Sequence, residues 1–309
     1  MRDQLVIGTR KSPLALWQSE FVKAQLEASH PGLVVTLKHV ITMGDKTQES
    51  KAAIPAIGGK GLFTAELEEC LARGEIDLAV HSLKDLPTEL DPQFVVGAIP
   101  KRSFVEDVVV TRSGEKLLYL PTGATIGTSS VRRSSQILRL RPDFRIAMIR
   151  GNVDTRLRKV RAEDGEYDAT LLARAGLARL GMEQEITHTL TEEEMLPAPG
   201  QGALGVECRA TDAELLAMLV PLHCDNTAAE VTAERVFLRL LGAGCNTPVA
   251  ARATVVGSDR LSFKGRCLSP NGQRCIEVHG EDALQSATRL GEAMARKALE
   301  NGFKSLCAA

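Results

Sequence analysis

The sequence predicts an α/β protein, and three observations indicate this class. Short apolar runs of strand length alternate with longer segments in which apolar residues recur at helical spacing. Gly- and Pro-containing segments separate these elements. The chain has 309 residues, of which 44% are hydrophobic and 25% charged, as expected for a globular protein of two or three domains. Because strands alternate with helices, we expect mostly parallel sheets.

The first α/β unit begins with an apolar strand over Gln4–Thr9. Ser12 followed by Pro13 is a favoured way to start a helix, because the hydroxyl caps it and proline suits its first turn. Apolar residues recur on one face of this helix at Leu14, Trp17, Phe21, Val22 and Leu26. The next predicted elements are a strand over Leu33–Thr42, a helix over Leu62–Arg73 and strands over Ile76–Val80 and Phe94–Ile99.

The pattern then restarts, which indicates a second α/β unit. Its predicted strands cover Val105–Thr111, Ala124–Gly127, Phe144–Ile149 and Ala169–Leu172, and its helices cover Ser130–Leu140, Asn152–Ala162 and Ala173–Leu180. The Pro- and Gly-rich segment Leu196–Gly202 is predicted to be a linker. The tail differs, with a helix over Glu230–Leu241, about three strands in 248–280 and a helix over 282–300. This tail predicts a small α+β third domain.

The segment Met43–Gly61 is long, polar and rich in glycine. Loops of this length are uncommon inside compact domains and are often lids or binding loops. The alternative is a disordered insertion.

Charge and composition exclude several functional classes. Lys+Arg total 38 and Asp+Glu 39, which gives a net charge of −1, and aromatic residues are only 4% of the chain. A nucleic-acid binder would usually be basic and richer in stacking side chains. No apolar run reaches the roughly 18 residues of a membrane span, and the N-terminal apolar stretch is too short for a signal peptide. We therefore expect no nucleic-acid or membrane partner and a cytoplasmic protein, or an organellar-matrix one if a transit peptide was removed.

The seven cysteines are odd in number and form no C-x-x-C pair, which argues against a disulfide framework or a zinc site. No nucleotide-binding, zinc-protease or serine-hydrolase motif is present in the sequence. We expect no metal.

Arginines gather where predicted strands end. Arg132 and Arg133 lie in the first turn of a helix that follows Gly127, and a helix N-terminus attracts anions. Arg150 and Arg156 repeat this arrangement at the next strand, and Arg10 repeats it in the first unit. Since ligands of α/β sheets bind at the carboxyl ends of strands, these arginines predict a site for a polyanionic ligand. Four other arginines of this stretch are expected to form a solvated basic face: Arg139, Arg141, Arg158 and Arg161.

Two further residues could carry chemistry. Asp85 follows a buried strand, where its carboxylate could stabilise a cation or move protons, or could simply occupy the turn before Pro87. Cys245 lies in a glycine-rich loop, where it could be a nucleophile, a covalent anchor or an ordinary packed thiol.

At these residues the sequence resembles the porphobilinogen deaminase family, also called hydroxymethylbilane synthases. The matching segments are TRKSPLALWQ (9–18), GGKGLF (58–63), HSLKDLP (81–87), IGTSSVRR (126–133), IRGNVDTRL (149–157), AGLARLG (175–181), PGQGALGVECR (199–209), TAERVFL (232–238) and GAGCNTP (242–248).

The resemblance implies two periplasmic-binding-protein-like α/β domains around a cleft and a small α+β C-terminal domain. The expected domain ranges are 1–99 with 200–218, 104–196, and 222–309. The implied enzyme is a transferase of tetrapyrrole and heme biosynthesis. It polymerises four porphobilinogen molecules head to tail with release of ammonia, giving hydroxymethylbilane. The family is monomeric, and its product passes to the next enzyme of the pathway.

The family also implies roles for individual residues. Asp85 would be the catalytic aspartate, and Cys245 would carry a covalent dipyrromethane cofactor through a thioether. The residues implied to surround the cofactor and substrate carboxylates are Arg10, Ser12, Lys60, Ser82, Lys84, Thr128, Ser130, Arg132, Arg133, Arg150, Gly151, Arg156 and Gln201.

The chain departs from the family pattern in three places, one of which is the connection near Arg161–Asp164, which is shorter in relatives. Gly242-Ala243 replaces a Glu-Gly pair before the cysteine, and Ser103 and Glu106 fall in a stretch where relatives have Glu and Arg. The competing hypothesis is a non-catalytic, two-lobed protein that binds a small carboxylate. That hypothesis explains the arginines but gives Asp85 and Cys245 no role.

Overall fold

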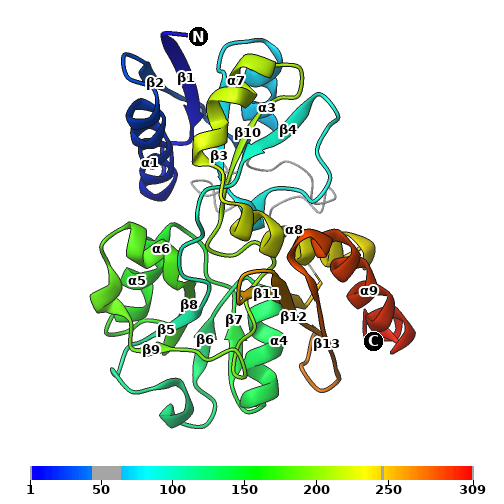
Figure 1. Cartoon of the computed structure of the whole chain (residues 1–309). Helices are drawn as coiled ribbons and strands as arrows, with labels where there is room; N and C mark the ends of the chain where they lie inside the picture. The colour runs from blue at the N-terminus through cyan, green and yellow to red at the C-terminus, as the bar shows by residue number, and fades with distance from the viewer. Residues whose placement is uncertain (1, 44–63, 245–246, 308–309) are drawn as a thin grey trace. The chain divides into compact units, whose positions relative to one another are not determined.

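The computed structural model describes residues 2–43, 64–244 and 247–307 (Figure 1). The chain divides into two compact units, Met1–Ser103 with Ala203–Ala228, and Phe104–Gly202 with Ala229–Ala309. The first unit holds a five-stranded sheet, and the second holds another five-stranded sheet and a three-stranded sheet. The two α/β units and the small third sheet predicted from the sequence are therefore present, whereas the ranges of three separate domains stay a prediction.

The first sheet has the strand order β2-β1-β3-β10-β4. Strands β1, β2 and β3 are parallel, and β10 is antiparallel to both of its neighbours, so the sheet is mostly parallel as predicted. The elements of this unit are β1 (Gln4–Thr9), α1 (Pro13–Ser29), β2 (Val34–His39), α3 (Ala65–Ala72), β3 (Leu78–Ser82), a 3-10 helix (Leu83–Asp85), β4 (Phe94–Ala98), β10 (Leu204–Arg209), α7 (Ala213–Leu219) and a 3-10 helix (Val220–Leu222).

Apolar side chains cover both faces of this sheet, as a buried parallel sheet requires. On one face Leu5 and Ile7 of β1 pack with Leu26 of α1 and with α7. On the other face α3 packs on β3. The expected apolar face of α1 is partly wrong, because Trp17 is exposed and stacks on Phe21 at 5.4 Å between ring centroids.

The second five-stranded sheet has the order β7-β6-β8-β5-β9, which repeats the arrangement of the first. In each sheet, one strand runs antiparallel to its neighbours, β10 in the first sheet and β5 in the second. Each of these strands directly follows a point where the chain passes from one unit to the other. The elements are β5 (Asp107–Thr111), a 3-10 helix (Leu117–Tyr119), β6 (Thr125–Gly127), α4 (Val131–Leu140), β7 (Arg145–Ala147), α5 (Val153–Arg161), β8 (Ala169–Ala173), α6 (Arg174–Arg179), a 3-10 helix (Glu183–Glu185) and β9 (His188–Thr189).

The C-terminal part is an antiparallel sheet of order β11-β12-β13 with helices packed on it, which confirms the α+β prediction. Phe237, Phe263 and Met294 lie in its core. The helix expected over 282–300 begins only at Ala287, because the last strand is longer than predicted. The elements are α8 (Asp225–Leu240), β11 (Val249–Val256), β12 (Arg260–Leu268), β13 (Cys275–Ala283), a 3-10 helix (Leu284–Ser286), α9 (Ala287–Glu300) and α10 (Phe303–Cys307).

The turn between β12 and β13 packs on α4 within the second unit. Gly272 has φ +72°, and a Cβ added there would overlap the Ser135 carbonyl oxygen of α4. Only glycine allows both this backbone conformation and this approach. The C-terminal sheet is thereby held closely against the helix that carries Arg132 and Arg133.

None of the helices in the described ranges has the length and apolar character needed to cross a membrane.

Candidate active site

In the first unit, predicted site residues lie at one edge of the sheet. Strands β1 and β3 are parallel neighbours, with Ile7 paired to Leu78. Arg10 and Ser12 follow β1, and Asp85 follows β3, so these residues extend from the same carboxyl edge. Ser12 caps α1, as predicted, because its hydroxyl accepts a hydrogen bond from the Ala15 amide at 3.3 Å.

The turn that carries Asp85 is fixed by buried neighbours. Gln18 of α1 donates from its side chain to the Ser82 hydroxyl at 2.8 Å, and the Leu83 amide donates to the Ala203 carbonyl at 3.0 Å. Leu83 is buried, Lys84 is half-buried and Asp85 is exposed. The turn therefore anchors its apolar side chain and leaves the carboxylate accessible to a ligand.

The second unit presents the same kind of edge after β6 and β7. Thr128 is buried, and its hydroxyl accepts a hydrogen bond from the Ser130 amide at 3.1 Å. Ser130 is the N-cap of α4, and its hydroxyl accepts from the Arg133 amide at 3.4 Å. Gly127 leaves β6 next to Tyr167, so a side chain there would collide with that ring. The predicted strand-to-helix turn is confirmed, whereas Ser130, expected as the first residue of the helix, is its N-cap.

After β7 the chain turns sharply at Gly151, which has φ +112°. The Arg156 guanidinium donates from Nε to the Gly151 carbonyl at 2.8 Å, and Lys159 donates to the Arg150 carbonyl at 3.0 Å. Both arginines are half-buried at the carboxyl edge of β7. This turn holds Arg150, Gly151 and Arg156 together, as their sequence positions predict.

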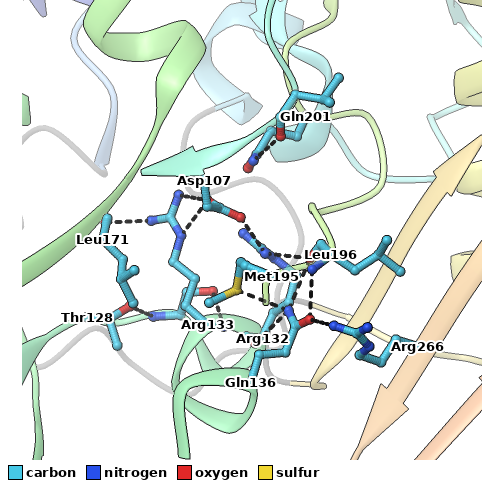
Figure 2. Close-up of polar contacts among 12 residues, drawn as sticks. Asp107, Thr128, Arg132, Arg133, Gln136, Leu171, Met195, Leu196, Gln201 and Arg266 are labelled. Carbon is cyan, nitrogen blue, oxygen red and sulfur yellow. Dashed lines mark hydrogen bonds and ion pairs between the residues drawn. The ribbon is translucent and has the colours of Figure 1, made fainter. Parts of the chain in front are cut away.

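Arg132 and Arg133 lie in a buried network around Asp107, shown in Figure 2. Arg133 donates from Nε and Nη2 to Asp107 Oδ1 at 2.9 and 2.7 Å, and Arg132 donates from Nη1 to Oδ2 at 2.7 Å. Arg132 Nη1 also donates to the Leu196 carbonyl at 2.9 Å, and Arg133 Nη1 to the Leu171 carbonyl at 2.9 Å. Sequence reasoning predicted an anion at this helix N-terminus but missed that Asp107 supplies one.

The network nonetheless carries an excess of positive charge. Both guanidiniums make their ion pairs in the described structure with the single carboxylate of Asp107. Burial lowers the pKa of Arg132; Asp107 opposes this shift and Arg133 adds to it. Within the described residues, Nε and Nη2 of Arg132 donate to no protein acceptor. The arrangement therefore suits a further anion, for which a carboxylate is well matched.

Comparison with known proteins adds a second line of information. Residues 5–217 match the family model described as porphobilinogen deaminase, dipyromethane cofactor binding domain, and residues 228–300 match the model of the porphobilinogen deaminase C-terminal domain. The curated porphobilinogen deaminase of Roseiflexus castenholzii is 45% identical over 308 residues, and that of Roseiflexus sp. is 44% identical over 308 residues. Each alignment covers 100% of both chains.

The chain belongs to the porphobilinogen deaminase family.

Among solved structures, the methionine-binding protein MetQ is similar over 71% of this chain and 89% of its own, at 12% identity and a TM-score of 0.44. A likeness this weak does not establish the fold, which the strand orders of the sheets show directly.

The family's cofactor-binding domain covers the residues that the network brings together. A dipyrromethane carries carboxylate side chains, and a buried arginine pair with excess positive charge and unused donors fits such a group. Residues Lys60 and Cys245, which the resemblance to the family places near the cofactor, lie outside the described residues. Gln201 is fully buried and donates to the Val105 carbonyl at 2.7 Å. Within the second unit it therefore links the two segments next to which the chain passes to and from the first unit.

Of the departures from the family at 103–106, Glu106 belongs to a local cluster in the second unit. Glu106 lies 3.5 Å from Arg174, whose guanidinium also stacks over the Phe104 ring at 3.6 Å. Arg174 further pairs with Glu183 at 3.3 Å. An acidic residue at 106 is thus compensated by a cation from α6.

The arginines expected on a solvated face mostly lie there. Arg139, Arg158 and Arg161 are exposed. Arg141 differs from the expectation, because it pairs with Asp143 at 2.7 Å and donates to the Leu118 carbonyl at 2.9 Å. It therefore fixes the C-terminal end of α4.

Proposed function

We propose that this chain is a transferase that joins four porphobilinogen molecules head to tail, releases ammonia and yields hydroxymethylbilane. The observation that carries the proposal is the buried Arg132–Arg133–Asp107 network with its excess positive charge, in a chain that matches the family end to end. Each porphobilinogen carries an acetate and a propionate, so a growing product accumulates negative charge. An arginine-rich site in a chain of net charge −1 suits such a ligand.

The arginines would bind and orient the carboxylates. Arg132 offers unused guanidinium donors, and Arg150 and Arg156 extend from the same sheet edge. A planar guanidinium binds a carboxylate through two parallel hydrogen bonds, which fixes direction as well as position. The other residues proposed to contact cofactor or substrate are Arg10, Ser12, Lys60, Ser82, Lys84, Thr128, Ser130, Arg133, Gly151 and Gln201.

Asp85 is the proposed catalytic residue. Loss of ammonia from porphobilinogen leaves positive charge on the pyrrole, and a nearby carboxylate stabilises that charge. The Asp85 carboxylate is exposed at the end of a short, well-anchored turn, so it can reach a bound pyrrole nitrogen and hold or release its proton.

A dipyrromethane on Cys245, attached by a thioether, would supply a covalent anchor on which the product grows. Gly242 has φ +62° and opens the loop that leads to this cysteine. The substitution of Gly242-Ala243 for the family's Glu-Gly pair leaves the thiol itself in place. The chain is further proposed to be a cytoplasmic monomer that hands its product to the next tetrapyrrole-pathway enzyme and binds neither nucleic acid nor membranes.

The decisive experiment is intact-mass spectrometry of the purified, denatured protein, followed by peptide mapping. Two linked pyrrole units on the Cys245 peptide are expected. The Asp85→Asn variant should keep this mass but turn over porphobilinogen at least about a hundredfold more slowly, as expected when a positioned acid–base group is lost.

An unmodified Cys245, both as purified and after addition of porphobilinogen, would contradict the proposal. It would favour the non-catalytic carboxylate-binding protein instead. Turnover by Asp85→Asn at the wild-type rate would refute the role of that residue alone.

A further inference from the structure

We infer that Gln136 and Arg266 are positioning residues for Arg132, and that through them the C-terminal sheet sets the orientation of a carboxylate-binding guanidinium. The inference rests on the proposed function. It concerns residues that neither the family resemblance nor the arginine pattern singles out, and Figure 2 shows the contacts among Arg132, Gln136, Leu196 and Arg266.

Gln136 lies one turn after Arg132 on α4 and is 1% exposed. Its amide clamps the backbone of Leu196 from both sides: Oε1 accepts from the Leu196 amide at 2.9 Å, and Nε2 donates to the Leu196 carbonyl at 3.0 Å. Nε2 also donates to the Arg132 carbonyl at 3.2 Å. A buried amide with both ends satisfied in this way has one orientation, because rotating it would leave donors facing donors.

The Leu196 carbonyl connects Gln136 to Arg132, because it accepts hydrogen bonds from both side chains. The same oxygen accepts from Arg132 Nη1 at 2.9 Å, so it fixes one corner of the guanidinium while Asp107 Oδ2 fixes that nitrogen from another side at 2.7 Å. The plane of the guanidinium follows from these two acceptors. The direction in which Nε and Nη2 can meet a carboxylate follows from the plane.

Arg266 extends the network into the C-terminal sheet. From β12 it donates through Nη1 to Gln136 Oε1 at 2.9 Å and to the Glu193 carbonyl at 3.2 Å. Glu277 on β13 accepts from its Nε at 2.7 Å and holds it in place. Gln136 Oε1 thus accepts from two donors, the amide of Leu196, which is the first residue of the predicted linker, and Arg266 of the C-terminal sheet.

Under the proposed function, these contacts orient the Arg132 guanidinium in addition to packing α4 against the C-terminal sheet. Arg132 of α4 would bind the carboxylates of the cofactor, and Arg266 lies on β12 of the C-terminal sheet. The Leu196 carbonyl and Gln136 link these two arginines by hydrogen bonds, so loosening Gln136 or Arg266 should weaken carboxylate binding more than it weakens the fold.

The test uses Arg266→Gln and Gln136→Met in the full-length enzyme, which break the network at different points. The matched control is Arg260→Gln, which removes another cross-strand Arg–Glu pair of the same sheet, to Glu281, with no contact to Gln136. Three quantities are measured: the fraction of purified protein with the Cys245 adduct by intact mass, KM and kcat per loaded enzyme with porphobilinogen, and the urea midpoint.

For both test variants we expect KM to rise about three- to tenfold, because each loses one or two buried hydrogen bonds that orient a charged group. The kcat should stay within about twofold of the wild-type value. The adduct fraction should fall, and Arg266→Lys should recover most of the KM because its ammonium can still donate to Gln136. Arg260→Gln should match the wild type. Either test variant that keeps a cooperative urea transition decides the matter.

If the wild type carries and acquires no adduct, the proposed function fails and this inference fails with it. If the wild type is loaded but the KM of a folded Arg266→Gln or Gln136→Met variant equals that of Arg260→Gln, only the inference is overturned. A fall in the urea midpoint without a change in KM also overturns it, since that result identifies a purely structural role.

Discussion

Replacing Asp107 by asparagine isolates the charge at the centre of the buried network. The Asp107 side chain is 0% exposed and accepts three hydrogen bonds at 2.7–2.9 Å from Arg132 and Arg133. Asparagine has nearly the same shape, but it removes the negative charge and must point its amide NH2 at one of the guanidiniums. Two buried cations then lack a counter-ion. Breaking a buried ion pair by removing one partner costs about 3–5 kcal/mol.

For a unit of this size, each kcal/mol shifts the melting temperature by roughly 2–4 °C, so Asp107→Asn should melt about 6–20 °C below the wild type. Thermal and urea unfolding measure this. The control is Asp143→Asn, which removes the ion pair between Asp143 and Arg141. This pair has similar geometry, but the Asp143 side chain is 31% exposed. Exposed pairs contribute little, so this variant should unfold close to the wild type. If Asp107→Asn is no less stable than Asp143→Asn, the network is not the buried charge cluster described above.

Three further outcomes are expected. Gly272→Ala should lower the unfolding free energy by about 2–5 kcal/mol, because it adds both backbone strain and an overlap with α4. The control is Gly257→Ala, where φ is +65° and the added Cβ meets open space, so the unfolding free energy should fall by only about 1–2 kcal/mol. Equal urea midpoints for the two variants would contradict the packing of Gly272 on α4. Burial raises the pKa of the Cys208 thiol to about 11. Because the thiolate is the reactive form, iodoacetamide at pH 8 should alkylate Cys208 only after the protein is denatured. Peptide mapping that finds Cys208 alkylated in the native protein would contradict this expectation. The pKa of Asp143 is lowered to about 2, mainly by the hydrogen bond from Arg141 and in part by backbone amides. The small stabilisation that this exposed pair contributes is therefore present above about pH 4 and is lost as the pH falls through 2. In Arg141→Met, NMR titration should find that this pKa has risen toward 3.8, and an unchanged value would show that Arg141 is not its cause.

Much of the fold follows from local patterns that the sequence displays directly. The strand at Gln4–Thr9, the cap at Ser12 and the helix that starts at Pro13 are found as predicted, because each depends on residues only a few positions apart. The helix expected from Ser130 is also found, with Ser130 as its N-cap rather than its first residue. Where boundaries moved, as at the start of α9, a strand that pairs with β12 extended beyond its own apolar pattern.

The insertion of β10 between β3 and β4 could not be derived from spacing. Its residues come more than a hundred positions after β3, and pairing between strands is set by tertiary packing rather than by either strand's own sequence. The segment resemblance at 199–209 implied that the chain returns to the first domain, but it gave no place in the sheet.

By itself the sequence determined the fold class, the gathering of arginines at strand ends and the family, since periodicity, turn chemistry and motifs are properties of neighbouring residues. The tertiary structure alone decided how those arginines are used. Asp107, 25 positions before Arg132, becomes its counter-ion, and Gln136 and Arg266, 130 positions apart, become hydrogen-bonded neighbours. The physical reason is that a buried charge or amide must find its partners wherever the fold brings them, and no distance along the chain encodes that meeting.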